Sequence, residues 1–344
     1  MRQNNGFHMY VSYQDDDTVS IYRVDRGSGE VARQAEIAMA GGPGPMVLSP
    51  DRQVLHIGLR GGQQLSSYRV DQSTGGLSHI RAVPLQGEPV YVSTDRTGRF
   101  VLSAYYYQST AAVHAVASDG AATVPPVEWR MTAPGAHAIQ TDRSNRFAFV
   151  PHIANRGPNA IFQFQFDERT GRLTPSAPDR HSPTEYLGPR AFVFHPTLST
   201  VYFSDEQNGS VTGYTLDPSA GTLTPFQTIS TLPAGYNEPN TCSQIHMAPS
   251  GKFLYAPNRG HNSVASFTVD AVSGRLTATG RVPTEPVPRA FNLDPSGNFL
   301  FVGGLDSGRL AAYRIAQDTG ELTPLETYEG GNRPMWVLLT DLSA

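Results

Sequence analysis

The sequence has one cysteine, a low share of charged residues and no long apolar segment. Its only thiol, Cys242, excludes an internal disulfide framework and a zinc site built from several thiolates. No run approaches the roughly 18 consecutive apolar residues of a membrane-spanning helix. Charged residues make up 16% of the chain and the net charge is −4, too weak a field to attract nucleic acid or an acidic membrane face. With no apolar leader before the first strand, we expect a cytoplasmic protein without nucleic-acid or membrane partners.

Helical periodicity and the familiar catalytic motifs are also missing. No window of about a dozen residues repeats its apolar positions with a period of 3.6, so long helices are not expected. The chain contains no G-x-S-x-G elbow, no H-E-x-x-H and no P-loop, and its histidines lack metal-ligand spacing. The sequence therefore gives no support for serine-nucleophile chemistry or nucleotide hydrolysis, and we expect neither a metal nor another cofactor.

What the chain does contain is a repeated short-strand module. Residues 188–196, an apolar run entered through Pro189-Arg190, return as residues 287–295 with Pro288-Arg289 at the same place. Each copy opens a unit of four short strands joined by turns led by Pro, Asp or Gly, which suits a chain with 33 Gly and 27 Pro. Six complete units are expected to start at Met46, Val90, His137, Phe192, Ile245 and Phe291.

The two ends of the chain complete a seventh unit. Residues 8–37 offer three strands without an innermost one, and residues 334–339 offer an innermost strand alone. Joining them closes a ring and removes the exposed edges of an open array. The sequence therefore predicts an all-β, seven-bladed β-propeller with four-stranded antiparallel blades, which forms a single domain over residues 1–344. The tryptophan–aspartate and kelch signatures of other propellers are absent.

The loops on one face of this ring carry the reactive side chains. In an antiparallel meander alternate loops fall on opposite faces, so the stereotyped Pro, Asp and Gly turns share one face. The variable loops share the other face and hold His137, Arg190 and Arg289 before the first strands, Glu206 and Arg259 after the second strands, and Arg60, Tyr105, His152 and Asn155 in the same class of loop. Because such loops converge at the central channel, residues distant in sequence are expected to form one site.

Each candidate also has a structural interpretation. Glu206 could be a solvated turn acid, and His137 a buried structural histidine, instead of groups that transfer protons. Arg190 and Arg289 occupy equivalent repeat positions, so they could serve the blade junction, and Arg259 could be a surface turn residue. Three arginines around one channel favour the binding of an anion, either a carboxylate or a phosphate.

The sequence resembles the lactonase family of seven-bladed β-propellers over essentially its whole length. The residues that carry the resemblance include 9–13, 44–51, 188–196, 202–206, 245–259, 288–292 and 333–337. This family includes propeller-type 6-phosphogluconolactonases and a 3-carboxy-cis,cis-muconate lactonizing enzyme, and is not known for a required metal. The resemblance implies an active-site group of His137, Arg190, Glu206 and Arg259.

The function that the resemblance implies is hydrolysis of a sugar lactone, 6-phosphogluconolactone in the pentose phosphate pathway. Glu206 or His137 would take a proton from water, while Arg190 and Arg259 would stabilise the oxyanion or anchor the substrate anion. Residues expected to bind this lactone or organic-acid anion are Arg289, Arg60, Tyr105, His152 and Asn155. The long loop 231–242 contains no Arg or Lys to help hold a phosphate. Two alternatives stay open: a muconate-type lactonizing enzyme or hydrolase of another organic-acid lactone, and a non-catalytic binding platform.

Overall fold

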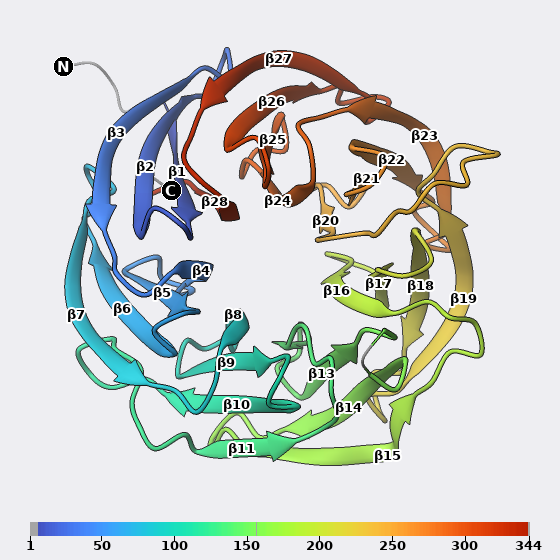
Figure 1. Cartoon of the computed structure of the whole chain (residues 1–344). Coiled ribbons are helices and arrows are strands. Elements are labelled where there is room, and N and C mark those ends of the chain that lie inside the picture. The colour runs from blue at the N-terminus through green and yellow to red at the C-terminus, as the bar shows by residue number, and fades with distance from the viewer. Residues whose placement is uncertain (1–5, 156, 343–344) are drawn as a thin grey trace.

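The computed structural model describes residues 6–155 and 157–342, and it consists of seven four-stranded antiparallel sheets arranged in a ring (Figure 1). We number blades 1 to 6 in chain order, and blade 7 is the one that both ends of the chain share. The predicted all-β, seven-bladed propeller is therefore confirmed. Among the described residues there is no helix long and apolar enough to cross a membrane.

Each blade runs from an innermost to an outermost strand. Blade 1 is β4 (Pro43–Leu48), β5 (Val54–Leu59), β6 (Gln64–Val70) and β7 (Leu77–Pro84); blade 2 is β8 (Pro89–Thr94), β9 (Phe100–Tyr105), β10 (Thr110–Ala115) and β11 (Glu128–Met131). Blade 3 is β12 (Gln140–Thr141), β13 (Phe147–His152), β14 (Ala160–Phe166) and β15 (Leu173–His181); blade 4 is β16 (Pro189–Phe194), β17 (Thr200–Asp205), β18 (Ser210–Leu216) and β19 (Leu223–Ser230). Blade 5 is β20 (His246–Met247), β21 (Phe253–Asn258), β22 (Ser263–Val269) and β23 (Leu276–Pro283); blade 6 is β24 (Pro288–Leu293), β25 (Phe299–Gly304), β26 (Arg309–Ile315) and β27 (Leu322–Glu329).

Blade 7 joins the two ends of the chain as predicted. Its strands are β28 (Pro334–Thr340), β1 (Gly6–Tyr13), β2 (Thr18–Asp25) and β3 (Val31–Ala38), in that order from the centre. β28 pairs antiparallel with β1 from His8 opposite Thr340 to Tyr13 opposite Pro334. Figure 1 shows the two strands side by side next to the C-terminus. This pairing completes the fourth strand of blade 7 and closes the ring by joining the two ends of the chain in one sheet.

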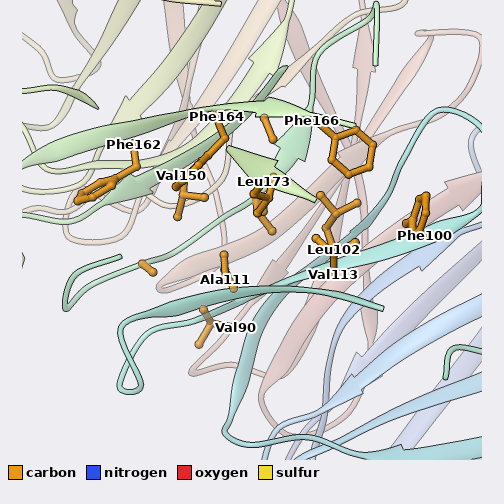
Figure 2. Packing of buried hydrophobic residues seen from close by; sticks show 14 of the residues in the cluster. Val90, Phe100, Leu102, Ala111, Val113, Val150, Phe162, Phe164, Phe166 and Leu173 are labelled. Atoms are coloured by element: carbon orange, nitrogen blue, oxygen red, sulfur yellow. The ribbon is translucent and has the colours of Figure 1, made fainter. Parts of the chain in front are cut away.

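The hydrophobic core lies between adjacent blades. Second strands such as β5, β9 and β17 are buried at every residue because both of their faces pack against neighbouring sheets. Between blades 2 and 3, Phe162, Phe164 and Phe166 of β14 belong to one buried cluster with Leu102 and Val113 (Figure 2). Outermost strands are exposed along most of their length, as in β3 and β27. Stacking of blades, rather than any one sheet, therefore buries the apolar side chains.

Tyrosine hydroxyl groups tie some second strands to the outer turn of the next blade. The three bonds join Tyr10 to the carbonyl of Gly75 (2.8 Å), Tyr202 to that of Gly274 (2.6 Å) and Tyr255 to that of Gly320 (2.9 Å). Each glycine has a positive φ of 70–74°, so the predicted Asp-to-Gly turns are the acceptors. These bonds fix the angle between blades, and so the positions of the loops at the channel.

The innermost strands differ in length from the sequence-based expectation. β16 and β24 begin at Pro189 and Pro288, so Arg190 and Arg289 lie inside strands rather than in front of them. In blades 3 and 5 only two residues form regular strand, and His137 precedes β12 by three residues. In blades 4 and 6 the pairing register shifts after the first residue of the innermost strand, an irregularity that periodicity alone does not reveal.

Candidate active site

A β-bulge interrupts five innermost strands at the same point. The pairing register shifts after Pro43, Pro89, Pro189, Pro288 and Pro334. A bulge leaves one residue unpaired and turns its side chain to a new direction, and a proline there forfeits no ladder hydrogen bond. The bulged segments contribute Pro45, Val90, Arg190, Arg289 and Met335 to the wall of a cavity in the channel. The recurring proline thus directs one side chain per blade towards the ring centre.

The central cavity has little free space. Its remaining volume is about 20 Å³, enough for about one water molecule. Besides the bulged segments, its wall includes Arg60, Tyr91, His137, Ala191, Gln244 and Trp336. The structure therefore brings four predicted site residues (Arg60, His137, Arg190 and Arg289) to one place, from blades 1, 3, 4 and 6. A substrate larger than water requires some of these side chains to move.

Glu206 lies behind Arg190 and links it to Arg259. Its Oε2 is 2.8 Å from Nε of Arg190, and its Oε1 is 2.9 Å from Nη2 of Arg259. The side chains of Arg190, Glu206 and Arg259 are 4%, 11% and 14% exposed. Glu206 follows β17 directly, where its backbone N–H donates to the carbonyl of Gly188 at 2.7 Å. One carboxylate therefore holds two guanidinium groups from neighbouring blades in a fixed arrangement.

Arg190 carries its positive charge at a buried position, where loss of hydration disfavours the charged form. Burial and, next, repulsion from Arg259 lower its pKa to about 10, while Glu206 opposes the shift. A buried ion pair of this kind contributes little net stability, because desolvation offsets most of the attraction. Titratable groups whose pKa values are shifted and that lie beside a cavity are instead typical of functional sites.

Arg259 is positioned by the long loop 231–242. Its backbone N–H donates to Thr241 and its Nη2 to the carbonyl of Cys242, both at 2.9 Å. The amide oxygen of Asn240 accepts the backbone N–H groups of Gly260 and His261 at 3.0 and 3.1 Å. Loop 231–242, which itself contains no Arg or Lys, therefore positions Arg259 of blade 5.

Gly260 lets this loop approach the turn, which leads to a prediction. A Cβ at this position would lie 2.0 Å from the carbonyl oxygen of Pro239, so Gly260→Ala must push the loop away from Arg259. We expect kcat/KM to fall by about 10²-fold, as misplacement of a site residue by about 1 Å produces. Gly280→Ala in β23 is the matched control, since nothing lies within 4 Å of its Cβ. Equal kcat/KM in both variants would show that the loop does not set the geometry of Arg259.

His137 is a buried imidazole surrounded by arginines. It is 9% exposed, and its backbone N–H donates to the carbonyl of Pro151 at 3.0 Å. Burial lowers its pKa well below the ordinary value, and Arg190, Arg289 and Arg259 lower it further. The ring of Tyr106 lies edge-on at 6.0 Å. At neutral pH the imidazole is therefore uncharged and has a lone pair that can accept a proton.

Two of the residues expected to bind substrate need correction. Tyr105 is 0% exposed, packs on Trp129 with ring centroids 5.0 Å apart, and accepts a hydrogen bond from Ser103. His152 is also 0% exposed, with its ring 4.5 Å from that of Phe162. Both side chains project from a face of their sheet into the packing between blades instead of into the channel, because the side chains of a strand alternate between the two faces of the sheet. A substrate in the cavity does not contact them.

Asn155 lies at the mouth of the channel rather than in the cavity wall. It is exposed, and its amide oxygen accepts a hydrogen bond from the hydroxyl of Tyr106 at 3.2 Å. Through Tyr106 it is connected to His137, so a role in binding stays a prediction. Among the described residues no three His, Cys, Asp or Glu side chains are grouped to hold a metal ion.

Sequence reasoning missed Gln244, Tyr91 and the bulged apolar residues of the cavity wall. Gln244 Oε1 accepts the backbone N–H of Phe291 at 3.0 Å, and the rings of Tyr91 and Trp336 are 5.4 Å apart. One signal was available: a proline recurs just before the bulge at positions 89, 189, 288 and 334. The residue after this proline lines the cavity in each case.

Comparison with known proteins identifies the fold and its relatives. The family model described as lactonase, 7-bladed beta-propeller matches residues 8–339. Proteins named 6-phosphogluconolactonase from Pectobacterium carotovorum subsp. carotovorum (strain PC1) and Serratia proteamaculans (strain 568) are each 32% identical, over 96% of this chain and 97% of their own. The structure of a periplasmic gluconolactonase from Pseudomonas aeruginosa superposes with a TM-score of 0.89 at 24% identity, covering 97% of this chain and 99% of that one, a likeness that concerns the fold. The chain belongs to the lactonase family of seven-bladed β-propellers.

Proposed function

We propose that the protein is a carboxylic ester hydrolase that opens 6-phosphogluconolactone to 6-phosphogluconate in the pentose phosphate pathway. The relatives at 32% identity carry that name over nearly the whole chain. The observation that carries the proposal is one cavity wall that combines the uncharged imidazole of His137 with the guanidinium of Arg190. Lactone hydrolysis needs a base for water and a positive charge for the developing oxyanion, and this pair supplies both.

His137 is the proposed general base. It lines the cavity, whereas both oxygens of Glu206 are engaged by arginines and Glu206 is not part of the cavity wall. As water attacks the ring carbonyl carbon, the new carbon–oxygen bond forms and a water proton passes to the imidazole. The depressed pKa of His137 makes the resulting imidazolium a strong acid, which suits it to the next step.

Arg190 is the proposed oxyanion partner, and Glu206 its positioning residue. The carbonyl oxygen becomes negative in the tetrahedral intermediate, and a preorganised buried cation stabilises that charge without reorganisation. When the intermediate collapses, the bond from the carbonyl carbon to the ring oxygen breaks. The ring oxygen takes the proton from His137, which restores the neutral imidazole and leaves a hydroxy acid.

The cytoplasm is the proposed compartment for this substrate. A sugar phosphate carries a charge that makes passage through a bilayer costly. The enzyme and this substrate are therefore expected in the compartment in which the sugar phosphate is formed. The resemblance in fold to a periplasmic gluconolactonase leaves the preferred lactone to be tested on the protein itself.

A lactone panel tests the proposed function. The purified protein is assayed at constant pH with 6-phosphogluconolactone, unphosphorylated gluconolactone and a muconolactone, each corrected for its spontaneous hydrolysis. We expect the highest kcat/KM with the phosphorylated lactone. Preferred turnover of the muconolactone would support the lactonizing alternative, and no turnover of any lactone would support the binding platform.

A further inference from the structure

The channel holds more positive than negative charge. Arg60 forms an ion pair with Glu88, and Glu206 is shared by Arg190 and Arg259. Arg289 lines the same cavity as Arg60 and Arg190, yet among residues 6–155 and 157–342 no carboxylate lies within ion-pairing distance of it. Four guanidinium groups thus face two carboxylates, an excess of two positive charges beside an uncharged His137.

Arg289 is the group in this cluster whose charge is least compensated. Burial lowers its pKa well below the ordinary value, and repulsion from Arg190, Arg259 and Arg60 adds to the effect, opposed by Glu206. Keeping an uncompensated cation in such surroundings lowers the stability of the fold, so this arginine does not serve stability. Placing an anion against it would relieve both the desolvation and the repulsion.

The backbone holds Arg289 at the cavity on both sides of its bulge. The amide oxygen of Asn262 accepts the N–H of Val287 at 2.9 Å, and that of Gln244 accepts the N–H of Phe291 at 3.0 Å. Val287 has a φ of +53°, a strained value for a β-branched residue. Strain of this kind persists at sites where a fixed geometry is needed. Arg289 is therefore presented by a rigid segment rather than by a mobile loop.

Arg60 offers a further donor from the blade 1 side of the cavity. Its Nε is buried without a hydrogen-bond partner among the described residues. Its Nη1 is 3.4 Å from the amide oxygen of Gln14, which leaves that contact long and weak. The side chain is 15% exposed, so it is within reach of a molecule in the channel.

We propose that Arg289, assisted by Arg60, forms a subsite for the phosphate group of the substrate, separate from the His137 and Arg190 pair that acts on the lactone carbonyl. The inference rests on the proposed function and adds the residues that select a phosphorylated lactone. Arg289 supplies the one positive charge of this subsite that Glu88 does not offset, and a phosphate monoester, which carries about −1.5 to −2 at neutral pH, is the group of the substrate that this charge attracts. A guanidinium binds two phosphate oxygens at once through parallel N–H groups. An unphosphorylated gluconolactone offers this subsite nothing to bind.

Arg289→Gln tests the subsite by comparing two substrates. For 6-phosphogluconolactone we expect KM to rise about 30- to 100-fold with kcat within about threefold, since a charged arginine–phosphate contact of about 2–3 kcal/mol is lost. For unphosphorylated gluconolactone we expect both constants to stay within about threefold. Arg289→Lys should give an intermediate KM, because it keeps the charge and loses the paired donors. Arg309→Gln is the matched control, since Arg309 is a partly exposed arginine of the same blade that is already paired with Glu285 and Glu329.

Binding of the two products gives a readout that does not depend on turnover. By calorimetry, Arg289→Gln should weaken 6-phosphogluconate by the same 30- to 100-fold and leave gluconate unchanged. Equal losses for both substrates and both products, or no loss for either, would overturn the subsite. If the wild-type protein hydrolyses neither lactone, the proposed function fails, and the product titrations still decide the subsite. Thermal unfolding checks the fold, and loss of an unpaired buried cation should not lower Tm.

Discussion

His137→Gln is expected to lower kcat for 6-phosphogluconolactone by about 10³-fold, within the 10²- to 10⁴-fold that a positioned general base contributes. The variant keeps a polar side chain of similar reach, yet an amide does not accept a proton from water. The loss corresponds to about 4 kcal/mol of transition-state stabilisation. His79→Gln on the outermost strand β7 is the control, with the expected result of unchanged kcat.

The pH profile separates a base from a merely structural histidine. Because the pKa of His137 lies well below its ordinary value, the imidazole stays unprotonated, and kcat should hold level as the pH falls from 8 to 6. The acid limb should begin below that range in the wild type and be absent from His137→Gln. The measurement follows kcat, since the phosphate of the substrate itself titrates near pH 6 and affects KM. An identical acid limb in both proteins would remove His137 from the mechanism.

Acid destabilisation that depends on His152 is the second large effect that we expect. Burial lowers the pKa of His152 to about 4, against about 6.5 in the unfolded chain. Between these values the unfolded state binds the proton and the folded state does not, so the stability present above pH 6.5 is lost as the pH falls towards 4. At pH 5 the loss is about 2 kcal/mol, from about 1.5 pH units at about 1.4 kcal/mol each.

Urea unfolding at pH 7 and pH 5 measures this contribution. His152→Phe keeps a ring against Phe162 and removes the titrating group, so its free energy of unfolding should fall by about 2 kcal/mol less than that of the wild type. Buried Asp205 acts in the opposite sense, because burial raises its pKa to about 7 and the folded state binds its proton first. Asp205→Asn should therefore steepen the acid loss. Equal pH dependence in wild type and His152→Phe would show that His152 is protonated without cost in the folded protein.

The ring could be predicted from the sequence because its signals are local and repeated. Turn residues recur with each module, and residues 334–339 supply the innermost strand that residues 8–37 lack. Pairing residues 334–339 with the strands of residues 8–37 gives every blade four strands, so a closed ring of seven blades follows from the strands that the sequence contains. The positions of Arg60, His137, Arg190 and Arg289 at the channel could be anticipated in the same way, from the class of loop or strand end on which each one stands.

The direction of individual side chains could not be predicted from loop class. Tyr105 and His152 end second strands beside the channel, and only the pleat of β9 and β13 turns them into the core. Arg190 and Arg289 point to the cavity because a bulge shifts the register after Pro189 and Pro288. A bulge depends on pairing with the next strand, which is a tertiary property.

The sequence by itself determined the number of blades, the shared seventh blade and the face of the ring on which the reactive residues gather, because these depend on local turn chemistry and on the pairing of strands within each blade. Only the tertiary structure decided which charged side chains lie close to one another, which of them are buried and which form ion pairs. Glu206 is held by Arg190 and Arg259, while within the part of the chain that the structure describes no carboxylate is paired with Arg289. These outcomes depend on distances across the ring between blades, and such distances arise only when the ring closes.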